Sequence, residues 1–393
     1  MIDYLVTGLN YQIIIKRKVG KRMQLIIAGD LAPTPSNIEL FNNGNVKELL
    51  GEELCFLLKN TNFFIFNLEV PLTDEETPIK KCGLNLIAPT STINGIKALN
   101  PSLISLANNH ILDQGVQGLK STERILTEEG IPFVGIGDNL SIASEPYIIE
   151  HNGMKVGIYA CAEHEFSIAT ENTPGANPFD PLESPDHVLN LKSRCDYVIV
   201  LYHGGKEHYR YPSPYLQKVC RKIVEKGADL VICQHSHCIG CYEEYKDSMI
   251  VYGQGNFLFD RSDNEFWQTS LLIKLEISDK SNVEFIPIVK KGNVVRIANK
   301  EQGKDILDQF QKRSNEIKNE RFIIDNYKEY AKQMYSSYLA SMHGNNLVFK
   351  VLNKISGHRF VHMLYSERSL LKIRNVIECE AHREMFLTGL NNK

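Results

Sequence analysis

A polar stretch in the first third of the chain combines residue types that could carry acid–base or metal chemistry. A strand-like apolar run over 101–107 ends just before Asn109 and His110, and Asp113 precedes a stretch predicted to be helical from about 117 to 130. An Asn can supply a neutral oxygen ligand, the adjacent His can hold or donate a proton, and a nearby carboxylate can orient the imidazole. The same stretch could equally be a helix entry with Asn109 or Asp113 as its capping residue. On its own it leaves both interpretations open.

Residues of the same kind follow other strand-like runs. Five such runs end in a residue that can bind a metal ion: Asp30, Glu69, Asn109, His203 and the pair His235 and His237. The carboxyl ends of parallel strands lie along one edge of a sheet, so these side chains could converge there. Taken singly, each has an ordinary alternative, such as a turn former at Asp30 or a buried, hydrogen-bonded imidazole at His203. Six of them at five strand ends favour a metal site.

The donor types in this set predict the kind of ion. Two carboxylates, one Asn and three His form a mixed oxygen and nitrogen set, which suits Mn, Fe or Zn rather than Ca or Mg. A carboxylate such as Glu69 can bridge two ions. Two ions ~3.5–4 Å apart would clamp a phosphate ester between them. The predicted cofactor is therefore a divalent metal, present as one or two ions.

The elements that must position these residues follow an alternating pattern of strands and helices. Strand-length apolar runs cover 25–28, 63–67, 154–161, 196–202 and 229–233, with helical stretches near 45–59, 117–130 and 214–226. Runs at 269–277 and 283–289 are predicted to be an antiparallel pair that closes the sheet. The pattern predicts an α/β fold.

The chain divides into three predicted parts. Residues 23–300 form the predicted α/β domain, and residues 301–393 have helical periodicity throughout, with no long linker at the boundary. Residues 1–22 are interpreted as an N-terminal extension, with Met23 opening the first core strand and standing as an alternative start of the protein.

Composition excludes several classes of protein. The 393 residues carry a net charge of −3, which is not the strongly basic balance of a nucleic-acid binder. No apolar run approaches the ~20 residues that span a bilayer. The positive charges at 16–22 follow the apolar stretch 11–15 rather than precede it, which is unlike a signal peptide. Nine scattered Cys suit reduced thiols, so a cytoplasmic location is expected.

A series of short motifs resembles the CapA family of poly-γ-glutamate capsule biosynthesis proteins, a branch of the calcineurin-like metallophosphoesterase superfamily. In order they are Gly29-Asp30, Asn67-Leu68-Glu69-Val70-Pro71, Ala107-Asn108-Asn109-His110-x-x-Asp113-x-Gly115, His203-Gly204-Gly205-x-Glu207-His208, His235-x-His237 and Gly255-Asn256-Phe257-x-Phe259-Asp260. The match runs from about Met23 to Arg261. The resemblance implies a four-layer α/β/β/α metallophosphoesterase-like sandwich, followed here by a C-terminal helical region that the motifs do not cover. It also implies a role in making, anchoring or processing an anionic cell-surface polymer.

The resemblance also implies a role for each motif residue. Asp30 and His237 would hold one ion and Glu69 would bridge to a second ion, held by Asn109, His203 and His235. His110 would be the proton donor, steadied by Asp113. This chain departs from the superfamily pattern, because Ala32 stands where Asp-x-His would place a His ligand and Glu69 takes the place of the usual bridging Asp.

Other polar residues are candidates for contact with substrate. Glu165 ends another strand-like run, Glu207 follows the His203-Gly-Gly turn, and Asn256 lies in the last motif; all three are predicted to bind substrate. Lys81, Arg210 and Arg261 are candidate anion contacts, with an ordinary solvated side chain as the alternative for each.

Three functions remain open at this level. The first is a metal-dependent hydrolase that acts on a phosphoester or a related bond in surface-polymer metabolism, with an anionic polymer or phosphoester as substrate. The second is a non-catalytic assembly or polymer-binding protein on the same fold. The third is a metal-dependent amide hydrolase that cuts γ-glutamyl links. In each case a protein partner could bind the C-terminal helices, and neither a nucleic acid nor a transmembrane segment is expected.

Overall fold

The computed structural model describes residues 4–7, 10–13, 22–261, 263–278, 281–344, 347–357 and 359–391. The backbone of 4–7 and 10–13 forms an antiparallel pair, β1 (Tyr4–Thr7) and β2 (Asn10–Ile13). Apart from these strands and Arg22, the predicted extension over 1–22 lies outside the described residues. The chain groups into two compact units, Met1–Ile323 and Ile324–Lys393, which are described separately.

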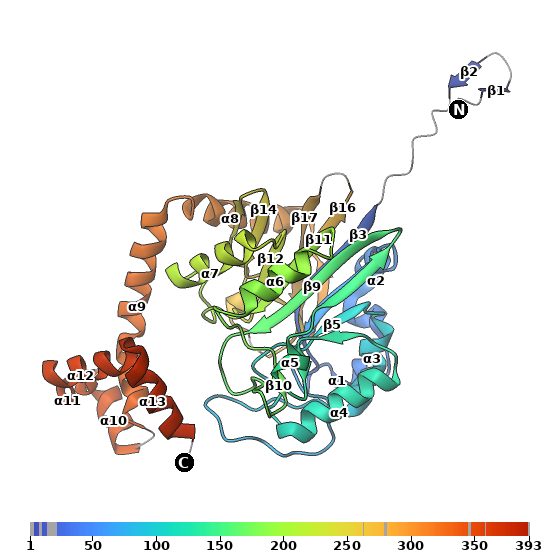
Figure 1. The fold of residues 1–393 in the computed structure, drawn as a ribbon. Helices are drawn as coiled ribbons and strands as arrows, with labels where there is room; N and C mark the ends of the chain where they lie inside the picture. Colours follow the sequence, from blue (N-terminus) through green and yellow to red (C-terminus); the bar gives the residue numbers. More distant parts are fainter. Residues whose placement is uncertain are drawn as a thin grey trace. The chain divides into compact units, whose positions relative to one another are not determined.

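The first unit contains a sheet of eight strands (Figure 1). Its spatial order is β18 (Val294–Ile297), β17 (Asn282–Lys291), β16 (Thr269–Ile277), β3 (Met23–Ala32), β4 (Phe63–Leu68), β5 (Leu103–Ser105) and β6 (Phe133–Val134), with β15 (Asn256–Phe259) paired to β3. Strands β3 to β6 are parallel, and β15 is parallel to β3. The antiparallel pair β16 and β17 confirms the pair predicted from the sequence.

A second sheet has six strands. Its order is β13 (Tyr242–Tyr245), β14 (Ser248–Tyr252), β12 (Leu230–Gln234), β11 (Tyr197–His203), β9 (Met154–Ala162) and β8 (Tyr147–His151). The four central strands are parallel, and β8 and β13 run antiparallel at the edges. A small sheet joins β7 (Ile136–Gly137) and β10 (Gly175–Ala176).

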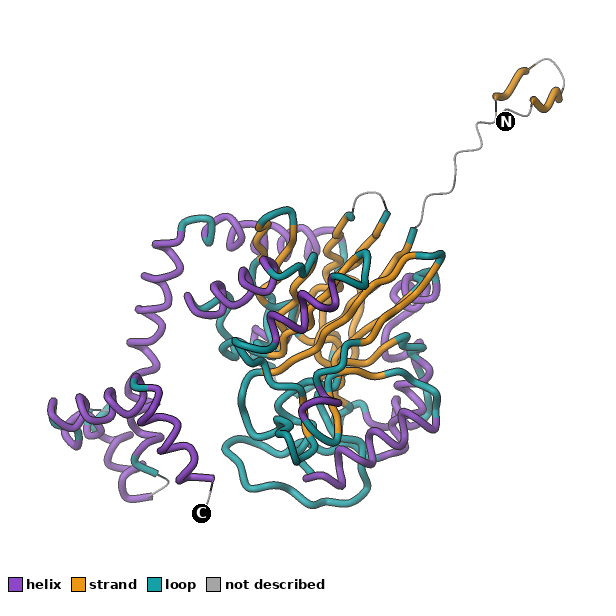
Figure 2. The backbone as a smooth tube through the Cα atoms, in the orientation of Figure 1, coloured by secondary structure: helices purple, strands orange, loops and turns teal. Residues whose placement is uncertain are grey.

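Helices cover the outer faces of both sheets (Figure 2). On the eight-stranded sheet they are α1 (Ile38–Asn42), α2 (Val46–Lys59), α3 (Ile93–Ala98) and α4 (Gly115–Glu128); on the six-stranded sheet they are α6 (Ser184–Lys192) and α7 (Pro214–Glu225). The other short elements of this unit are α5 (Leu140–Ala143), η1 (Thr90–Thr92) and η2 (Glu265–Trp267). Helix α7 begins as its sequence predicts, because Ser213 accepts a hydrogen bond from the Leu216 amide and Pro214 is the first helical residue.

Three apolar clusters separate these elements into four layers. One lies between the eight-stranded sheet and its helices, one between the two sheets, and one between the six-stranded sheet and its helices. Side chains alternate along β3, so that Leu25 and Ile27 enter the central cluster while Ile26 and Ala28 enter the outer one. This arrangement confirms the predicted α/β/β/α sandwich.

Helix α8 (Lys300–Glu316) belongs to the first unit. Its Ile306 and Phe310 side chains lie in the central cluster, and the Phe310 ring is 5.2 Å from that of Tyr242 between centroids. The helical pattern starts near residue 301 in the sequence, but the two units divide between Ile323 and Ile324. The change in periodicity therefore precedes the structural division by one helix.

The second unit consists of helices. They are α9 (Glu320–Met342), which starts in the first unit, α10 (Leu347–Ile355), α11 (Phe360–Leu364), α12 (Glu367–Glu378) and α13 (Glu380–Asn391). A small cluster of Leu339, Phe349 and Val361 forms its core. None of the helices in the described part of the chain is long and apolar enough to cross a membrane.

A close approach of two backbone segments fixes β15 against β3. A Cβ atom at Gly29 would lie 1.9 Å from the Gly255 carbonyl oxygen, and Gly255 itself has a φ of +77°. Only glycine is compatible with that contact and with that conformation. The two glycines therefore place Asn256 directly beside Asp30, its register partner on β3.

We predict that Gly29→Ala destabilises the protein, because the added methyl group would push β15 away from β3. The expected cost is about 1–3 kcal/mol or more, as for overpacking of a core. Thermal and urea denaturation would measure it. Gly303→Ala in α8 is the matched control, since its added Cβ would be 3.8 Å from the nearest atom, and the helix gains up to ~1 kcal/mol from the substitution. Equal melting temperatures for Gly29→Ala and the wild type would contradict this account.

Candidate metal centre

The six predicted ligands lie together at the carboxyl ends of parallel strands from both sheets. They follow or end β3, β4 and β5 of the larger sheet and β11 and β12 of the smaller sheet: Asp30, Glu69, Asn109, His203, His235 and His237. All six residues are buried, with at most 7% of their surface exposed. The face-to-face packing of the sheets thus gathers residues that lie up to about two hundred positions apart in the sequence.

One group of donor atoms belongs to Glu69, His203 and His235. Each of the three can offer one atom such that all the atoms lie within 4.8 Å of one another. His203 Nε2 is 3.4 Å from Glu69 Oε1 and 3.2 Å from His235 Nδ1. The Asn109 Oδ1 atom is 3.0 Å from His203 Nε2 and adds a fourth donor.

A second group, formed by Asp30, Glu69 and His237, meets the same 4.8 Å criterion. His237 Nδ1 is 3.8 Å from Asp30 Oδ2 and 2.9 Å from Asn256 Oδ1. Glu69 is shared by the two groups, which is the position of a carboxylate that bridges two ions.

The surroundings of the Glu69 carboxylate show whether these residues are suited to bind a metal ion. Both of its oxygens are buried, and neither has a hydrogen-bond partner among the residues that the structure describes. A buried carboxylate without partners is costly unless a cation or hydrogen-bond donors compensate it. Two groups of nitrogen and oxygen donors meet at this carboxylate, so the donor set fits divalent cations such as Mn, Fe or Zn.

Burial shifts the pKa values of the clustered groups. Desolvation, followed by repulsion from Glu69, raises the pKa of Asp30 to about 7, and desolvation raises the pKa of Glu69 to about 8. Desolvation lowers the pKa of His203 and of His235, and lowers that of His237 to about 3. The imidazoles are therefore neutral near pH 7, which is the form that binds metals.

His110 and Asp113 form a pair at the edge of the cluster. His110 Nδ1 lies 2.6 Å from Asp113 Oδ2, and His110 Nε2 lies 3.9 Å from Glu69 Oε1. The imidazole is thus oriented by the carboxylate, with its other nitrogen facing the centre. Helix α4 has Gln114 as its N-cap, so the alternative role of Asn109 or Asp113 as the helix cap is wrong.

Lys81 completes this arrangement, which the sequence did not reveal. Its ammonium group forms an ion pair with Asp113 Oδ1 and lies 3.3 Å from His110 Nδ1. The Lys81 side chain is only 3% exposed, so the alternative of a solvated lysine is wrong. Asp113 also accepts a hydrogen bond of 2.6 Å from the Leu86 amide, which ties the 81–86 loop to the centre.

Two further asparagines hold the ligands in place. Asn67 Nδ2 donates to Asp30 Oδ1 at 2.8 Å and lies 3.4 Å from His203 Nδ1. Asn108 Nδ2 donates to Asn67 Oδ1 at 3.1 Å, and Asn108 Oδ1 accepts from the His110 amide at 3.0 Å. Both residues stand inside the sequence motifs, and that position was the only signal of their role.

The backbone at the His235 and His237 positions is in the left-handed region, with φ values of +85° and +52°. Such values are unusual for residues other than glycine, and they occur at functional sites where the surrounding structure holds them. The Asp30 carboxylate contributes here, because it accepts a 3.1 Å hydrogen bond from the His235 amide.

An open cavity of about 800 Å³ leads to the centre. Among its lining residues are Asn109, His110, His237 and two of the predicted substrate contacts, Glu165 and Glu207. Glu165 also accepts a 2.9 Å hydrogen bond from Asn109 Nδ2. The third predicted contact, Asn256, is not among the described residues that line this cavity.

The candidate anion contacts differ in their surroundings. Arg261 lines the cavity together with Lys81. The Arg210 guanidinium lies 4.6 Å from the centroid of the Phe266 ring and donates to the Ile239 carbonyl at 3.0 Å. Arg210 therefore has a structural role in holding the loops beside the centre.

Ala32, which stands in place of the expected His, is buried in the apolar cluster beneath the helices of the eight-stranded sheet. Its register partner is Phe259 on β15. The position that would supply a further ligand to the first ion is thus part of the apolar packing.

The two packed sheets and their outer helices define a metallophosphoesterase-like fold, with the shared carboxylate and its two donor groups as a candidate metal centre. Within that class, a family model described as "Bacterial capsule synthesis protein PGA_cap" matches residues 24–261. The chain belongs to this family of bacterial capsule synthesis proteins, as its motifs predicted.

Similar proteins in two Bacillus species are named as CapA proteins. The capsule biosynthesis protein CapA of Bacillus anthracis is 26% identical over 339 residues, which cover 80% of this chain and 82% of the relative. The PGA biosynthesis protein CapA of Bacillus subtilis is 28% identical over 210 residues, covering 52% of this chain and 55% of the relative. Among solved structures, a phosphatase from Mycoplasma pneumoniae aligns with a TM-score of 0.43 and 15% identity, covering 69% of this chain and 95% of that one.

We predict that stabilisation by a divalent metal grows as the pH rises from 6.5 to 8.5. Asp30 and Glu69 have pKa values raised to about 7 and about 8, so the metal-free folded state holds protons that the unfolded state, with values of 3.8 and 4.5, has lost. The metal-free protein therefore loses stability as the pH rises through this window. The buried histidines have the opposite effect on stability, because their lowered pKa values make the folded state more stable as the pH rises. That effect operates only below about pH 6.5, the pKa of a histidine in the unfolded chain. Metal binding needs ionised carboxylates, so competition by protons disappears over the same window.

Thermal unfolding with and without Mn²⁺ at several pH values measures this effect. The melting temperature without metal should fall from pH 6.5 to 8.5, and the rise caused by Mn²⁺ should increase. A metal-induced rise that is the same at all pH values would contradict the assignment of Asp30 and Glu69 to the centre.

We predict that Lys81→Met destabilises the protein by about 3–5 kcal/mol, because it leaves the Asp113 charge buried without its partner. The double variant Lys81→Met/Asp113→Asn should cost less than the sum of the two single changes, and urea denaturation of all three measures the coupling. Arg124→Met is the control, since the Arg124–Glu128 pair is 59% exposed on both sides and should contribute ~0.5 kcal/mol or less. If the loss of unfolding free energy in the double variant equalled the sum of the losses in the two single variants, Lys81 and Asp113 would not be coupled.

Proposed function

We propose that this protein is a metal-dependent hydrolase of the phosphoesterase type that acts in the formation of a bacterial capsule polymer such as poly-γ-glutamate. The observation that carries the proposal is the Glu69 carboxylate, buried and shared by two groups of donor atoms next to the His110–Asp113 pair. Membership of the capsule synthesis family supplies the biological context.

Asp30, Glu69 and His237 would hold one divalent ion, and Glu69, Asn109, His203 and His235 the other. When bound, such a pair polarises a phosphoryl oxygen and lowers the pKa of bound water. The neutral state of the three imidazoles, caused by their burial, supports this assignment.

His110 would act as the general acid. Its Nε2 atom faces the centre and would give a proton to the leaving oxygen, while Asp113 holds Nδ1 and keeps the ring oriented. Lys81, paired with the same carboxylate, holds Asp113 in position. The three side chains form one unit, and both Lys81 and His110 line the cavity.

The cavity suits a substrate with negative groups and exposed polar atoms. Arg261 provides positive charge in its lining, and Glu165 and Glu207 can accept hydrogen bonds from hydroxyl or amide groups. An anionic polymer end or a phosphoester intermediate of polymer synthesis has both features. The same arrangement could cleave a γ-glutamyl amide, so amide substrates belong in the assay.

A second candidate is a non-catalytic assembly or polymer-binding protein on this fold. Ala32 favours it, because the apolar packing at that position removes one ligand that a two-ion hydrolase is expected to have. The helical unit favours it too, since Leu347, Met363 and Met385 are each at least 77% exposed and could contact a protein partner. Metal content and turnover separate the two candidates.

We predict that His110→Ala lowers kcat by roughly 10²–10⁴ for phosphodiesters with a poor leaving group such as an alkoxide, which needs protonation. The loss of kcat should be much smaller for a phosphodiester whose leaving group is p-nitrophenolate, because that group leaves without being protonated. Steady-state assays of the Mn²⁺-loaded protein on both substrates measure the difference.

Metal content is the control, because His110 is outside both donor groups and its removal should leave the bound metal unchanged. Absence of turnover by the metal-loaded wild type, on phosphoester and amide substrates alike, would favour the non-catalytic candidate. Equal losses on both phosphodiesters would remove His110 from the role of general acid.

A further inference from the structure

We propose that Asn256 is a protein ligand, through Oδ1, of the ion assigned to Asp30, Glu69 and His237. The inference rests on the proposed two-ion centre and replaces the predicted substrate contact of Asn256 with a role in metal binding. It also gives this ion a fourth protein donor although Ala32 takes the place of the expected His.

Distances between donor atoms are those of one coordination sphere. Asn256 Oδ1 lies 2.9 Å from His237 Nδ1, which in turn lies 3.8 Å from Asp30 Oδ2. Two ligand atoms that are each ~2.1 Å from the same ion are about 3–4 Å apart at ordinary coordination angles. An ion among these three atoms therefore requires little movement of the side chains.

The other donor group provides an internal comparison. There the Asn109 Oδ1 atom lies 3.0 Å from His203 Nε2, close to the 2.9 Å that separates Asn256 from His237. Each group then consists of carboxylate oxygen, imidazole nitrogen and one amide oxygen, with Glu69 common to both. The two halves of the centre have the same types of donor, although they come from different strands.

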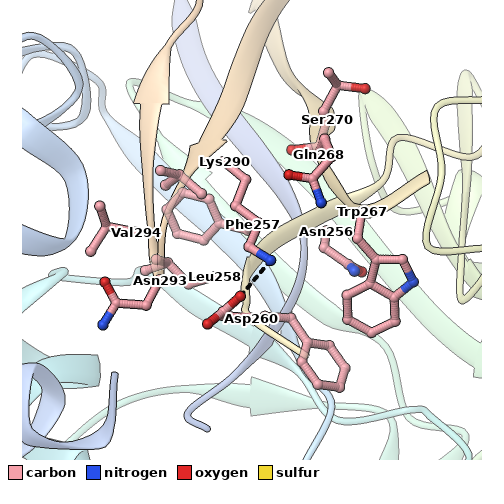
Figure 3. Close-up of a pocket in the computed structure, with 13 residues that line it drawn as sticks. Asn256, Phe257, Leu258, Asp260, Trp267, Gln268, Ser270, Lys290, Asn293 and Val294 are labelled. Atoms are coloured by element: carbon pink, nitrogen blue, oxygen red, sulfur yellow. Dashed lines mark ion pairs between the residues drawn. The ribbon is translucent and has the colours of Figure 1, made fainter. Parts of the chain in front are cut away.

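The backbone places Asn256 where the first ion needs a donor. Asn256 is the first residue of β15 and the register partner of Asp30 on β3, at the point where Gly29 and Gly255 bring the strands into contact. Figure 3 shows its amide directed toward Trp267 and away from the ion pair of Asp260 and Lys290. The Trp267 ring packs on His237, with 4.5 Å between centroids, so Asn256 and Trp267 together fix this imidazole.

The surroundings of the Asn256 amide nitrogen indicate which side-chain atom makes the interaction at the centre. Nδ2 is buried and lacks a hydrogen-bond partner among the residues described, which is unfavourable for an amide group. The contribution of the side chain is therefore made by Oδ1. The competing explanation is that Oδ1 only accepts a hydrogen bond from His237 Nδ1 and so orients the ring. The two explanations differ in whether Nδ1 carries a proton or a metal.

Metal counting tests the proposal without relying on turnover. Wild type, Asn256→Leu and Asn256→Asp are titrated with Mn²⁺ by calorimetry and analysed by mass spectrometry of bound metal. We expect two ions per wild-type chain, a roughly 10–100-fold loss of affinity at one site in Asn256→Leu, and recovery in Asn256→Asp, whose carboxylate can replace the amide oxygen. Asn94→Leu, at an exposed position on α3, is the matched control and should keep both ions.

The protonation state of His237 provides a second measurement on the wild type, which stays decisive if Asn256→Leu does not fold. In Zn²⁺-loaded protein with ¹⁵N-labelled histidine, the His237 signals, assigned by their loss in His237→Gln, should show metal on Nδ1 and a proton on Nε2. A protonated Nδ1, or two ions bound with unchanged affinity by Asn256→Leu, would overturn this proposal and leave the proposed function standing. A wild type that binds no metal would overturn both.

Discussion

The Glu69 carboxylate is the constraint on which the rest of the centre depends. It is fully buried, its pKa is raised to about 8 by that burial, and neither of its oxygens has a hydrogen-bond partner in the described part of the chain. A buried carboxylate without a hydrogen bond is unfavourable in a purely structural protein. Its surroundings explain it, because donor atoms from both sheets point at it from two sides. Removing any of those donors would weaken the binding of a cation that could compensate the charge.

The backbone conformation around the carboxylate also places donor side chains at the centre. Left-handed φ values at His235 and His237 turn both imidazoles toward the centre, and the Asp30 carboxylate holds the His235 amide. The contact of Gly29 with Gly255 brings β15 close enough for Asn256 to reach His237. The left-handed backbone conformations and the close glycine contact are unfavourable locally. They persist because the apolar clusters of the four layers hold the strands from both sides.

A second set of contacts connects the centre to its loops. Asp113 receives hydrogen bonds from His110 and from the Leu86 amide and pairs with buried Lys81, so one carboxylate orients the imidazole and anchors the loop that lines the cavity. The same carboxylate therefore contacts both the centre and the loop that lines the cavity. A change at Lys81 should disturb both the fold of the loop and the orientation of His110.

The sequence by itself determined the fold class and named six candidate ligands. Apolar periodicity fixes strands and helices because each has one or two faces to bury, and the carboxyl ends of parallel strands must share an edge, so Asp30, Glu69 and His203 could be grouped from their positions alone. What only the tertiary structure decided are contacts between segments with no shared periodicity. Burial of Lys81 against Asp113, the contact of Arg210 with Phe266 and the position of Asn256 beside His237 depend on how loops from distant strands pack. A pattern along one chain segment carries no information on which distant side chain will meet it, because that is set by the packing of the two sheets.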